Sequence, residues 1–116
     1  MTTTRVWIRY EPQLYCDLFT SILQGEDCVQ VVDYSEVVDP CKSIIQTELI
    51  DVIVISLDDQ DRPMLELLPL PTPNVKLIAF SPRGDRGFRR YPGQEQWEEV
   101  TPYGLSNLMA EFSEKT

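Results

Sequence analysis

Histidine is absent from this sequence, and basic residues are few: 10 lysines and arginines stand against 19 aspartates and glutamates in 116 residues. Without histidine, a zinc site would need carboxylates and scattered thiols, so we expect no metal. The net charge of −9 argues against direct binding of nucleic acid, which is held through basic residues, and against binding to an anionic membrane surface. The acidic residues are spread along the chain, which favours a role in solubility over a charged interaction tail.

Cysteine and long apolar runs are also scarce. Cys16, Cys28 and Cys41 are odd in number and lack CxxC spacing, so we interpret them as small apolar residues of a protein kept in the reducing cytoplasm. No apolar run approaches the ~20 residues of a membrane span, and no secretory signal follows Met1. We therefore expect a cytoplasmic protein without membrane contact, in which residues 1–116 form a single domain.

What the sequence does contain is a regular alternation of strand and helix patterns. Strands are predicted at residues 5–9, 28–32, 51–56, 74–80 and 97–100, and helices at 11–24, 35–47 and from Thr101 onward. The stretches 63–68 and 85–91 predict at most short or irregular helices. Because residues 51–56 are almost entirely aliphatic, they are typical of a central strand that is covered on both faces.

This alternation predicts an α/β fold with a parallel sheet, because parallel strands need helical crossovers between them. Right-handed crossovers favour a flavodoxin-like, doubly wound sheet of five strands in the order 2-1-3-4-5. Helices are expected on both faces, with the third and fourth short or irregular. The carboxyl ends of such strands form the edge where ligands bind, and Ser56 is the last residue of the central one.

Three segments carry a likeness to a known family: residues 10–15 (YEPQLY), 25–32 (GEDCVQVV) and 49–55 (LIDVIVI). With this order of elements, the chain resembles the receiver domain of two-component response regulators, and the resemblance is best from Val6 to Phe80. The resemblance implies a phosphorylation site at the carboxyl edge of the sheet. It also implies a partner-binding face formed by the fourth helix, the fifth strand and the last helix.

The residues at the implied phosphorylation site depart from the family's pattern. Arg9 and Tyr10 stand where the family has two acidic residues that hold magnesium, and Ser56 aligns with the phosphorylated aspartate. The hydroxyl residue after the fourth strand is kept as Ser81, whereas Thr101 replaces a lysine. A shift of register would make Asp58 or Asp59 the acceptor, but the acidic pair would still be missing; otherwise these two aspartates belong to a solvated turn.

These departures predict that the chain is not an enzyme. Transfer of a phosphoryl group to a carboxylate needs a divalent cation held by hard oxygen ligands, and Arg9 supplies the opposite charge. The Ser56 hydroxyl would need a general base, and no histidine is present to act as one. The loop after the first strand also lacks a glycine-rich phosphate cradle, so no cofactor is expected. The resemblance therefore implies a degenerate pseudo-receiver that works without phosphorylation.

Two sets of residues could take over from phosphorylation. Arg9 could pair with Glu11, Asp58 or Asp59 and fix the loops, or it could be an exposed arginine whose ion pair contributes ~0–1 kcal/mol. The second set is the arginine-rich segment 82–91, which carries a charge of +3 against −12 for the rest of the chain. Its arginines and the aromatic residues near them are candidates for binding a partner or an anion: Arg83, Arg86, Arg89, Arg90, Tyr91, Trp97 and Tyr103.

Two functions follow from these residues. The first is a phosphorylation-independent domain of bacterial signal transduction or transcriptional regulation, which acts by binding a protein partner or by forming a homodimer through the fourth-helix to last-helix face. The second is a small-molecule or nucleotide sensor that uses the arginine cluster as its anion site. The RxxxR spacing of Arg86 and Arg90 occurs in some cyclic-dinucleotide binders. The alternative without a binding function is that the whole cluster is a solvated loop.

Overall fold

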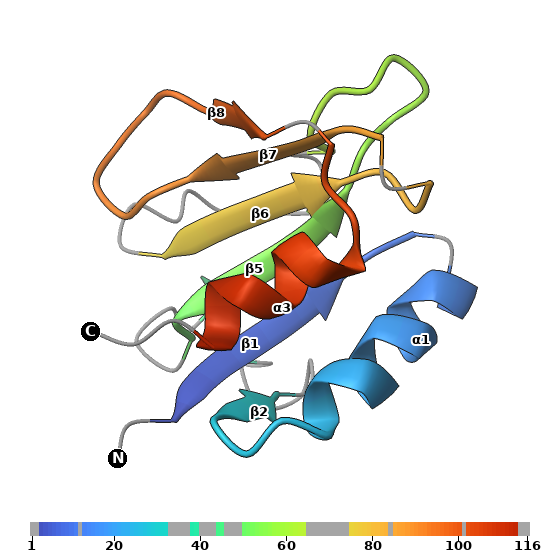
Figure 1. The fold of residues 1–116 in the computed structure, drawn as a ribbon. Helices are drawn as coiled ribbons and strands as arrows, with labels where there is room; N and C mark the ends of the chain where they lie inside the picture. Colours follow the sequence, from blue (N-terminus) through green and yellow to red (C-terminus); the bar gives the residue numbers. More distant parts are fainter. Residues whose placement is uncertain are drawn as a thin grey trace.

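A mixed β-sheet forms the centre of the computed structural model, and two helices lie across one of its faces (Figure 1). The structure describes residues 3–11, 13–32, 38–39, 44–45, 50–64, 75–83, 85–100 and 102–113. In these residues the sheet has six strands, in the order β2-β1-β5-β6-β7-β8. Their bounds are β1 Thr4–Arg9, β2 Val29–Val31, β5 Val52–Ser56, β6 Lys76–Phe80, β7 Gly87–Arg90 and β8 Glu98–Val100.

The sheet has a parallel half and an antiparallel half. Strands β2, β1, β5 and β6 run parallel to one another, and β7 and β8 are then added antiparallel at the β6 edge. The helices of the described residues are α1, Gln13–Gln24, and α3, Leu105–Ser113. A separate antiparallel pair consists of β3, Val38–Asp39, and β4, Ile44–Ile45.

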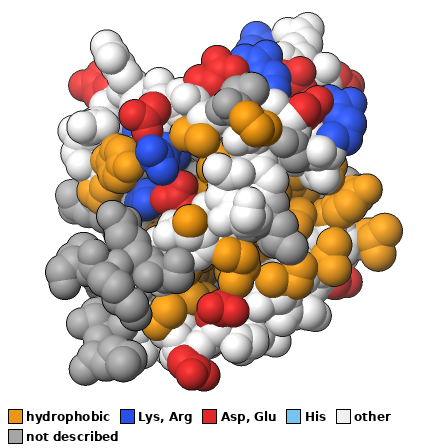
Figure 2. Space-filling view, in the orientation of Figure 1, with side chains coloured by type: hydrophobic (Ala, Val, Ile, Leu, Met, Phe, Trp, Pro, Cys, Tyr) orange, Lys and Arg blue, Asp and Glu red, His pale blue; other side chains and the backbone are white. Residues whose placement is uncertain are grey.

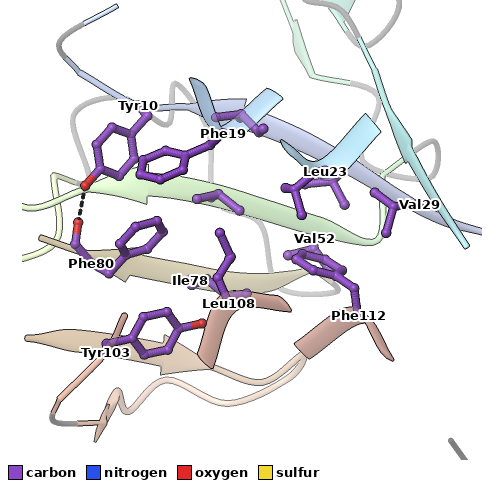
Figure 3. Packing of buried hydrophobic residues seen from close by; sticks show 13 residues of the cluster. Tyr10, Phe19, Leu23, Val29, Val52, Ile78, Phe80, Tyr103, Leu108 and Phe112 are labelled. Atoms are coloured by element: carbon purple, nitrogen blue, oxygen red, sulfur yellow. Dashed lines mark hydrogen bonds between the residues drawn. The ribbon is translucent and has the colours of Figure 1, made fainter. Parts of the chain in front are cut away.

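Both helices pack on the same side of the sheet, where they share one core with it (Figure 3). Side chains alternate between the two faces of a strand, so Val6 and Ile8 of β1 face the helices while Trp7 faces the other way. Phe19 of α1 and Phe112 of α3 belong to the same cluster of buried residues. The opposite face has its own buried cluster, to which Trp97 contributes from the segment before β8.

The predicted fold class is therefore wrong. The sheet is mixed instead of wholly parallel, it has six strands instead of five, and the described helices cover one face instead of two. A flavodoxin-like receiver architecture is excluded by the antiparallel β7 and β8. Four predicted strands are nevertheless present as β1, β2, β5 and β6, and the strand predicted at 97–100 is present as β8, at the edge of the sheet.

Two predicted helices are replaced by strands. Residues 85–91 contain β7, because this segment exchanges backbone hydrogen bonds with β6 on one side and β8 on the other, a stabilisation that local sequence patterns do not report. The fourth helix of the expected partner-binding face is thus absent from the described residues 85–91. The helix predicted at 35–47 is contradicted by β3 and β4, whose β-branched Val38, Ile44 and Ile45 favour an extended backbone.

The final helix begins later than predicted. Its first residue is Leu105, and the Gly104 N–H donates a hydrogen bond to Asn107 Oδ1 at 2.9 Å while the Asn107 N–H donates to the Gly104 carbonyl at 3.1 Å. This reciprocal pair caps the helix. Thr101, the predicted cap, lies outside the described residues, as do Cys41 and residues 65–68 of the short helix predicted after Pro63. In the described part of the chain, no helix has the length and apolar character needed to cross a membrane.

Candidate functional site

The carboxyl ends of β1, β5 and β6 meet at one edge of the sheet, where three of the predicted site residues lie together. Tyr10, Ser56 and Ser81 follow or end these strands, and all three are buried. These three residues thus lie at the carboxyl edge of the sheet, and their role there stays a prediction. Thr101, the remaining residue of the implied phosphorylation site besides Arg9, lies outside the described residues.

The polar groups of this edge are hydrogen-bonded to one another. The Tyr10 hydroxyl donates to the Phe80 carbonyl at 2.6 Å, which ties the loop after β1 to the end of β6 (Figure 3). The Glu11 N–H donates to Ser56 Oγ at 3.2 Å, which ties the same loop to the end of β5. We call Tyr10, Glu11, Ser56 and Phe80 the edge lock. Burial, reinforced by nearby Tyr15, raises the pKa of Tyr10 well above its ordinary value, so its hydroxyl stays a donor even in moderate alkali.

The remaining hydroxyl groups of this edge are also engaged within the chain. Ser56 Oγ lies 3.3 Å from the Met64 sulfur, and Ser81 Oγ accepts a hydrogen bond from the Arg83 N–H at 3.2 Å. The Arg9 guanidinium lies over the Trp7 ring, 5.5 Å from its centroid, on the side of the sheet away from the helices. Neither serine is positioned as an exposed nucleophile.

The acidic loop after β5 turns back on itself. Asp58 Oδ1 accepts hydrogen bonds from the N–H groups of Arg62 and Gln60, both at 2.9 Å, and the Arg62 side chain lies 3.4 Å from its other oxygen. The hydrogen bond from the Arg62 backbone is the main cause that lowers the pKa of Asp58. These contacts support the interpretation of Asp58 as a turn residue. Among the described residues, no group of three or more acidic or cysteine side chains could hold a metal ion.

Three of the four arginines in segment 82–91 are paired with carboxylates. Their N–O distances are 3.7 and 3.3 Å from Arg83 to Asp61 and Asp85, 3.0 Å from Arg86 to Glu99, and 2.6 and 3.1 Å from Arg89 to Glu98 and Glu111. An incoming anion would have to displace these carboxylates. The local excess of positive charge seen in the sequence is therefore largely offset by carboxylates outside the segment, and Asp85 is the one partner within it.

Glu111 joins α3 to the sheet from a buried position. Its side chain is 7% exposed and lies 2.5 Å from Lys76 Nζ of β6 and 3.1 Å from the Arg89 guanidinium of β7. The Tyr103 hydroxyl donates a hydrogen bond to the Glu111 carboxylate at 3.1 Å. Tyr103 is fully buried, and burial is the main cause that raises its pKa, with the negative charge of Glu111 acting in the same direction. Tyr103 is thus part of the core and not of an exposed binding surface.

The candidate aromatic residues are divided between the two sides of the sheet. Lys76 and Arg89 lie over the Tyr91 ring at 5.1 and 5.4 Å, on the side of α3. Arg90 lies over Trp97 at 5.5 Å, and Trp97 packs against the core on the opposite side. Because side chains alternate along a strand, Arg89 and Arg90 could not serve one surface. Tyr91, Trp97 and Tyr103 therefore do not form one joint surface.

A smaller arginine–aromatic surface remains on the side of the sheet away from the helices. We call it the hairpin face, because β7 and β8 supply most of it: Arg86, Phe88, Arg90, Trp97 and Glu99. Arg86 lies over Phe88 at 5.3 Å and reaches Glu99, the residue opposite Phe88 in the strand register. Among the described residues, Arg90 has no carboxylate within ion-pair distance and is stacked on Trp97 alone.

Sequence reasoning missed Lys76, Glu98, Glu99 and Glu111, which decide what the arginines do. Only Glu111 left a local signal, as an acidic residue three positions after Leu108 on the apolar stripe of α3. Glu98 and Glu99 follow from the antiparallel register of β7 and β8, and Lys76 lies on β6, the other neighbour of β7. No protein-family model matches this sequence, and comparison with the curated proteins and with the solved structures gave no match either.

Proposed function

We propose that this chain is a non-catalytic, phosphorylation-independent domain that acts by binding a protein partner through the hairpin face. The observation that carries the proposal is the pair of guanidinium–aromatic stacks on that face, Arg86 on Phe88 and Arg90 on Trp97, at 5.3 and 5.5 Å. Tryptophan and arginine are the residue types enriched where protein interfaces gain most of their binding energy. Among the described residues, Arg90 is the only arginine of segment 82–91 that has no carboxylate partner. A carboxylate of the partner protein could form this ion pair.

The edge lock supports the non-catalytic part of the proposal. In a domain that is switched by phosphate, the loops at the carboxyl edge must be free to reorganise around the new charge. Here the loop after β1 is bonded to the ends of both β5 and β6, and the buried Ser56 Oγ already accepts the Glu11 N–H. The domain would therefore hold one conformation at this edge without any modification.

Amide NMR spectra test the phosphorylation-independent part. The full chain is labelled and mixed with magnesium and either acetyl phosphate or beryllofluoride. We expect no shift changes at residues 10–11, 56–64 and 81–83. Large changes confined to those loops would show that the edge responds to phosphate chemistry and would overturn this part of the proposal.

Quantitative affinity capture from the source cells tests the hairpin face. The bait is the full chain, compared with Arg90→Glu and with the matched control Arg83→Glu, whose side chain is 69% exposed and lies outside the face. Loss of a central arginine contact costs about 2 kcal/mol, so we expect recovery of a partner to fall by about tenfold or more with Arg90→Glu. Equal recovery by all three baits would overturn the use of this face.

The ion pairs that Arg83, Arg86 and Arg89 already form with carboxylates argue against the alternative function, an anion or nucleotide sensor. A thermal-shift screen with phosphate, nucleotides and cyclic dinucleotides separates the two proposals. We expect no stabilisation of the wild-type chain. Stabilisation that Arg86→Ala and Arg90→Ala both remove would instead establish the sensor.

A further inference from the structure

The most exposed aliphatic side chains of the described residues lie on α1, on the helix side of the sheet and away from the hairpin face. Leu14 is 73% exposed and Leu18 is 48% exposed. They stand four residues apart, so they are neighbours on one stripe of the helix, and the half-buried Ile22 extends the stripe by another turn. Figure 2 shows hydrophobic side chains gathered on the side of the molecule where Figure 1 places α1.

These leucines are not required by the core. Phe19 and Leu23 form the buried side of α1, which packs on the sheet, while Leu14 and Leu18 point away from it. Single apolar residues on a surface are ordinary, but two adjacent leucines with Ile22 behind them form a continuous strip. A solvent-facing strip of this kind is the pattern by which two helices pair, with anchors spaced at i and i+4.

The charge around the stripe is of one sign. The sequence has no lysine or arginine from Tyr10 to Cys41, whereas it has Glu11, Asp17, Glu26 and Asp27 in the part that includes α1 and its two ends. Asp17 lies within α1 itself, where its carboxylate accepts a hydrogen bond from the Gln13 side chain at 2.9 Å. One carboxylate, that of Asp17, thus lies on the same helix as the strip, and the other three acidic residues stand in the sequence just before and just after this helix.

We propose that this stripe, Leu14, Leu18 and Ile22, is a second docking site and that it receives a basic amphipathic helix of a partner protein. The leucines would bury the apolar side of that helix, and lysines or arginines beside it would meet Glu11, Asp17 and Glu26. Charge selects this occupant. A second copy of the chain would bring the same carboxylates to the contact and a net charge of −9, so like charges would oppose a symmetric pairing.

The size of the site fits such a partner. Leu14 to Ile22 spans nine residues of helix, and the eight steps between them give a length of about 12 Å at 1.5 Å per residue. A partner helix of three to four turns would cover the stripe and reach the carboxylates at both ends. The site lies at the β1–β2 end of the sheet, across from β7 and β8, so it extends the proposed function without depending on the hairpin face.

A designed peptide provides the test. The probe is a synthetic 18-residue amphipathic helix with leucines on one stripe and lysines on the remaining positions, titrated into the labelled full chain. We expect amide shifts confined to residues 11–26. We also expect the double variant Leu14→Ser, Leu18→Ser to weaken the Kd at least tenfold. The matched control Tyr91→Ser, a change at the remaining exposed large hydrophobic residue among those that the structure describes, should alter it less than about twofold.

Three outcomes would overturn the proposal. Shifts scattered over the acidic surface, or equal affinity for a scrambled peptide of the same composition, would mean that charge alone drives binding. Self-association in analytical ultracentrifugation that the double variant abolishes would mean that a second copy occupies the stripe. Because Arg90→Glu should leave peptide affinity unchanged, failure of the hairpin face and failure of this site can be told apart.

Discussion

Gly87 shows how a single residue fixes the position of a whole segment. A Cβ built on Gly87 would lie 2.4 Å from both Cβ and Cγ of Tyr103, a distance at which atoms overlap. The Tyr103 ring is fully buried and stacks on Phe80 at a centroid distance of 5.3 Å, so it has little room to retreat. The absence of a side chain at Gly87 is what lets the segment before α3 close over β7.

We therefore expect Gly87→Ala to lower the free energy of unfolding by about 1–3 kcal/mol, the usual cost of overpacking a filled core. Urea denaturation measures this change. Gly25→Ala is the matched control, because its added Cβ would meet only the Ile22 carbonyl oxygen at an ordinary 3.4 Å. A Gly87→Ala variant as stable as Gly25→Ala would show that Tyr103 does not pack as described.

The residues of the carboxyl edge were partly predictable. The end of an aliphatic run marks the edge of a parallel strand, so the positions of Ser56 and Ser81 could be derived from the sequence. The hydrogen bonds that close this edge could not, because they join distant residues, as when the Tyr10 hydroxyl donates to a carbonyl 70 residues away. Local patterns report which side of an element is apolar, and they contain no information on such distant partners.

At the scale of elements, the lack of information on distant partners explains why the parallel half of the sheet was predictable and the antiparallel half was not. Strands β5 and β6 are almost entirely apolar, and β1 has three consecutive apolar residues, which made all three predictable. Strand β7 reads Gly-Phe-Arg-Arg, with one apolar side chain, and its extended form depends on pairing with β6 and β8 and on cross-strand contacts such as Arg89 with Glu98. The sequence pattern of this mixed sheet therefore predicted a parallel sheet with irregular elements.

The docking of α3 provides a test at this scale. Glu111 of α3 is nearly buried and lies against Lys76 of β6 and Arg89 of β7. Glu111→Gln would leave two partly buried cations without their shared carboxylate, and breaking such a pair from one side costs about 3–5 kcal/mol when it is fully buried. Because Arg89 keeps Glu98 and water reaches both cations, we expect a loss of about 2–4 kcal/mol.

Native-state hydrogen exchange locates this loss. Glu111→Gln should increase the exchange rate of the α3 amides, relative to the wild-type chain, more than it increases that of the β1 and β5 amides. The reason is that the removed contacts join the helix to the sheet. Glu98→Gln is the control, since Glu98 is 55% exposed and its ion pair with Arg89 contributes ~0–1 kcal/mol. Equal effects of the two variants would mean that Glu111 is solvated and that α3 is held by Leu108 and Phe112 alone.

On the scale of the whole molecule, the two proposed binding surfaces lie on opposite sides of one sheet. The α1 stripe is on the helix side at the β1–β2 end, and the hairpin face is on the other side at the β7–β8 end. A partner at one surface would not block the other. This separation suits a small adaptor that joins two proteins, and the edge lock between the surfaces would keep their relative positions constant.

The molecule as a whole should lose stability in alkali, because two buried phenols cannot ionise without unfolding. Burial raises the pKa of both Tyr10 and Tyr103 above the ordinary value near 10. Below about pH 10 the native and unfolded chains both keep these protons, so the two phenols cause no change. Above it the unfolded chain releases them while the native chain retains them, so the free energy of unfolding falls by about 1.4 kcal/mol per pH unit for each phenol.

Urea denaturation at pH 9, 10 and 11 measures this dependence as a slope, which is independent of the stability that each variant starts with. The two buried phenols contribute about equally to the slope above pH 10. Tyr10→Phe and Tyr103→Phe should therefore each remove about half of their joint contribution. A slope that Tyr10→Phe leaves unchanged while Tyr103→Phe reduces it would mean that the Tyr10 phenol can ionise in the native chain, and that the edge lock opens without unfolding.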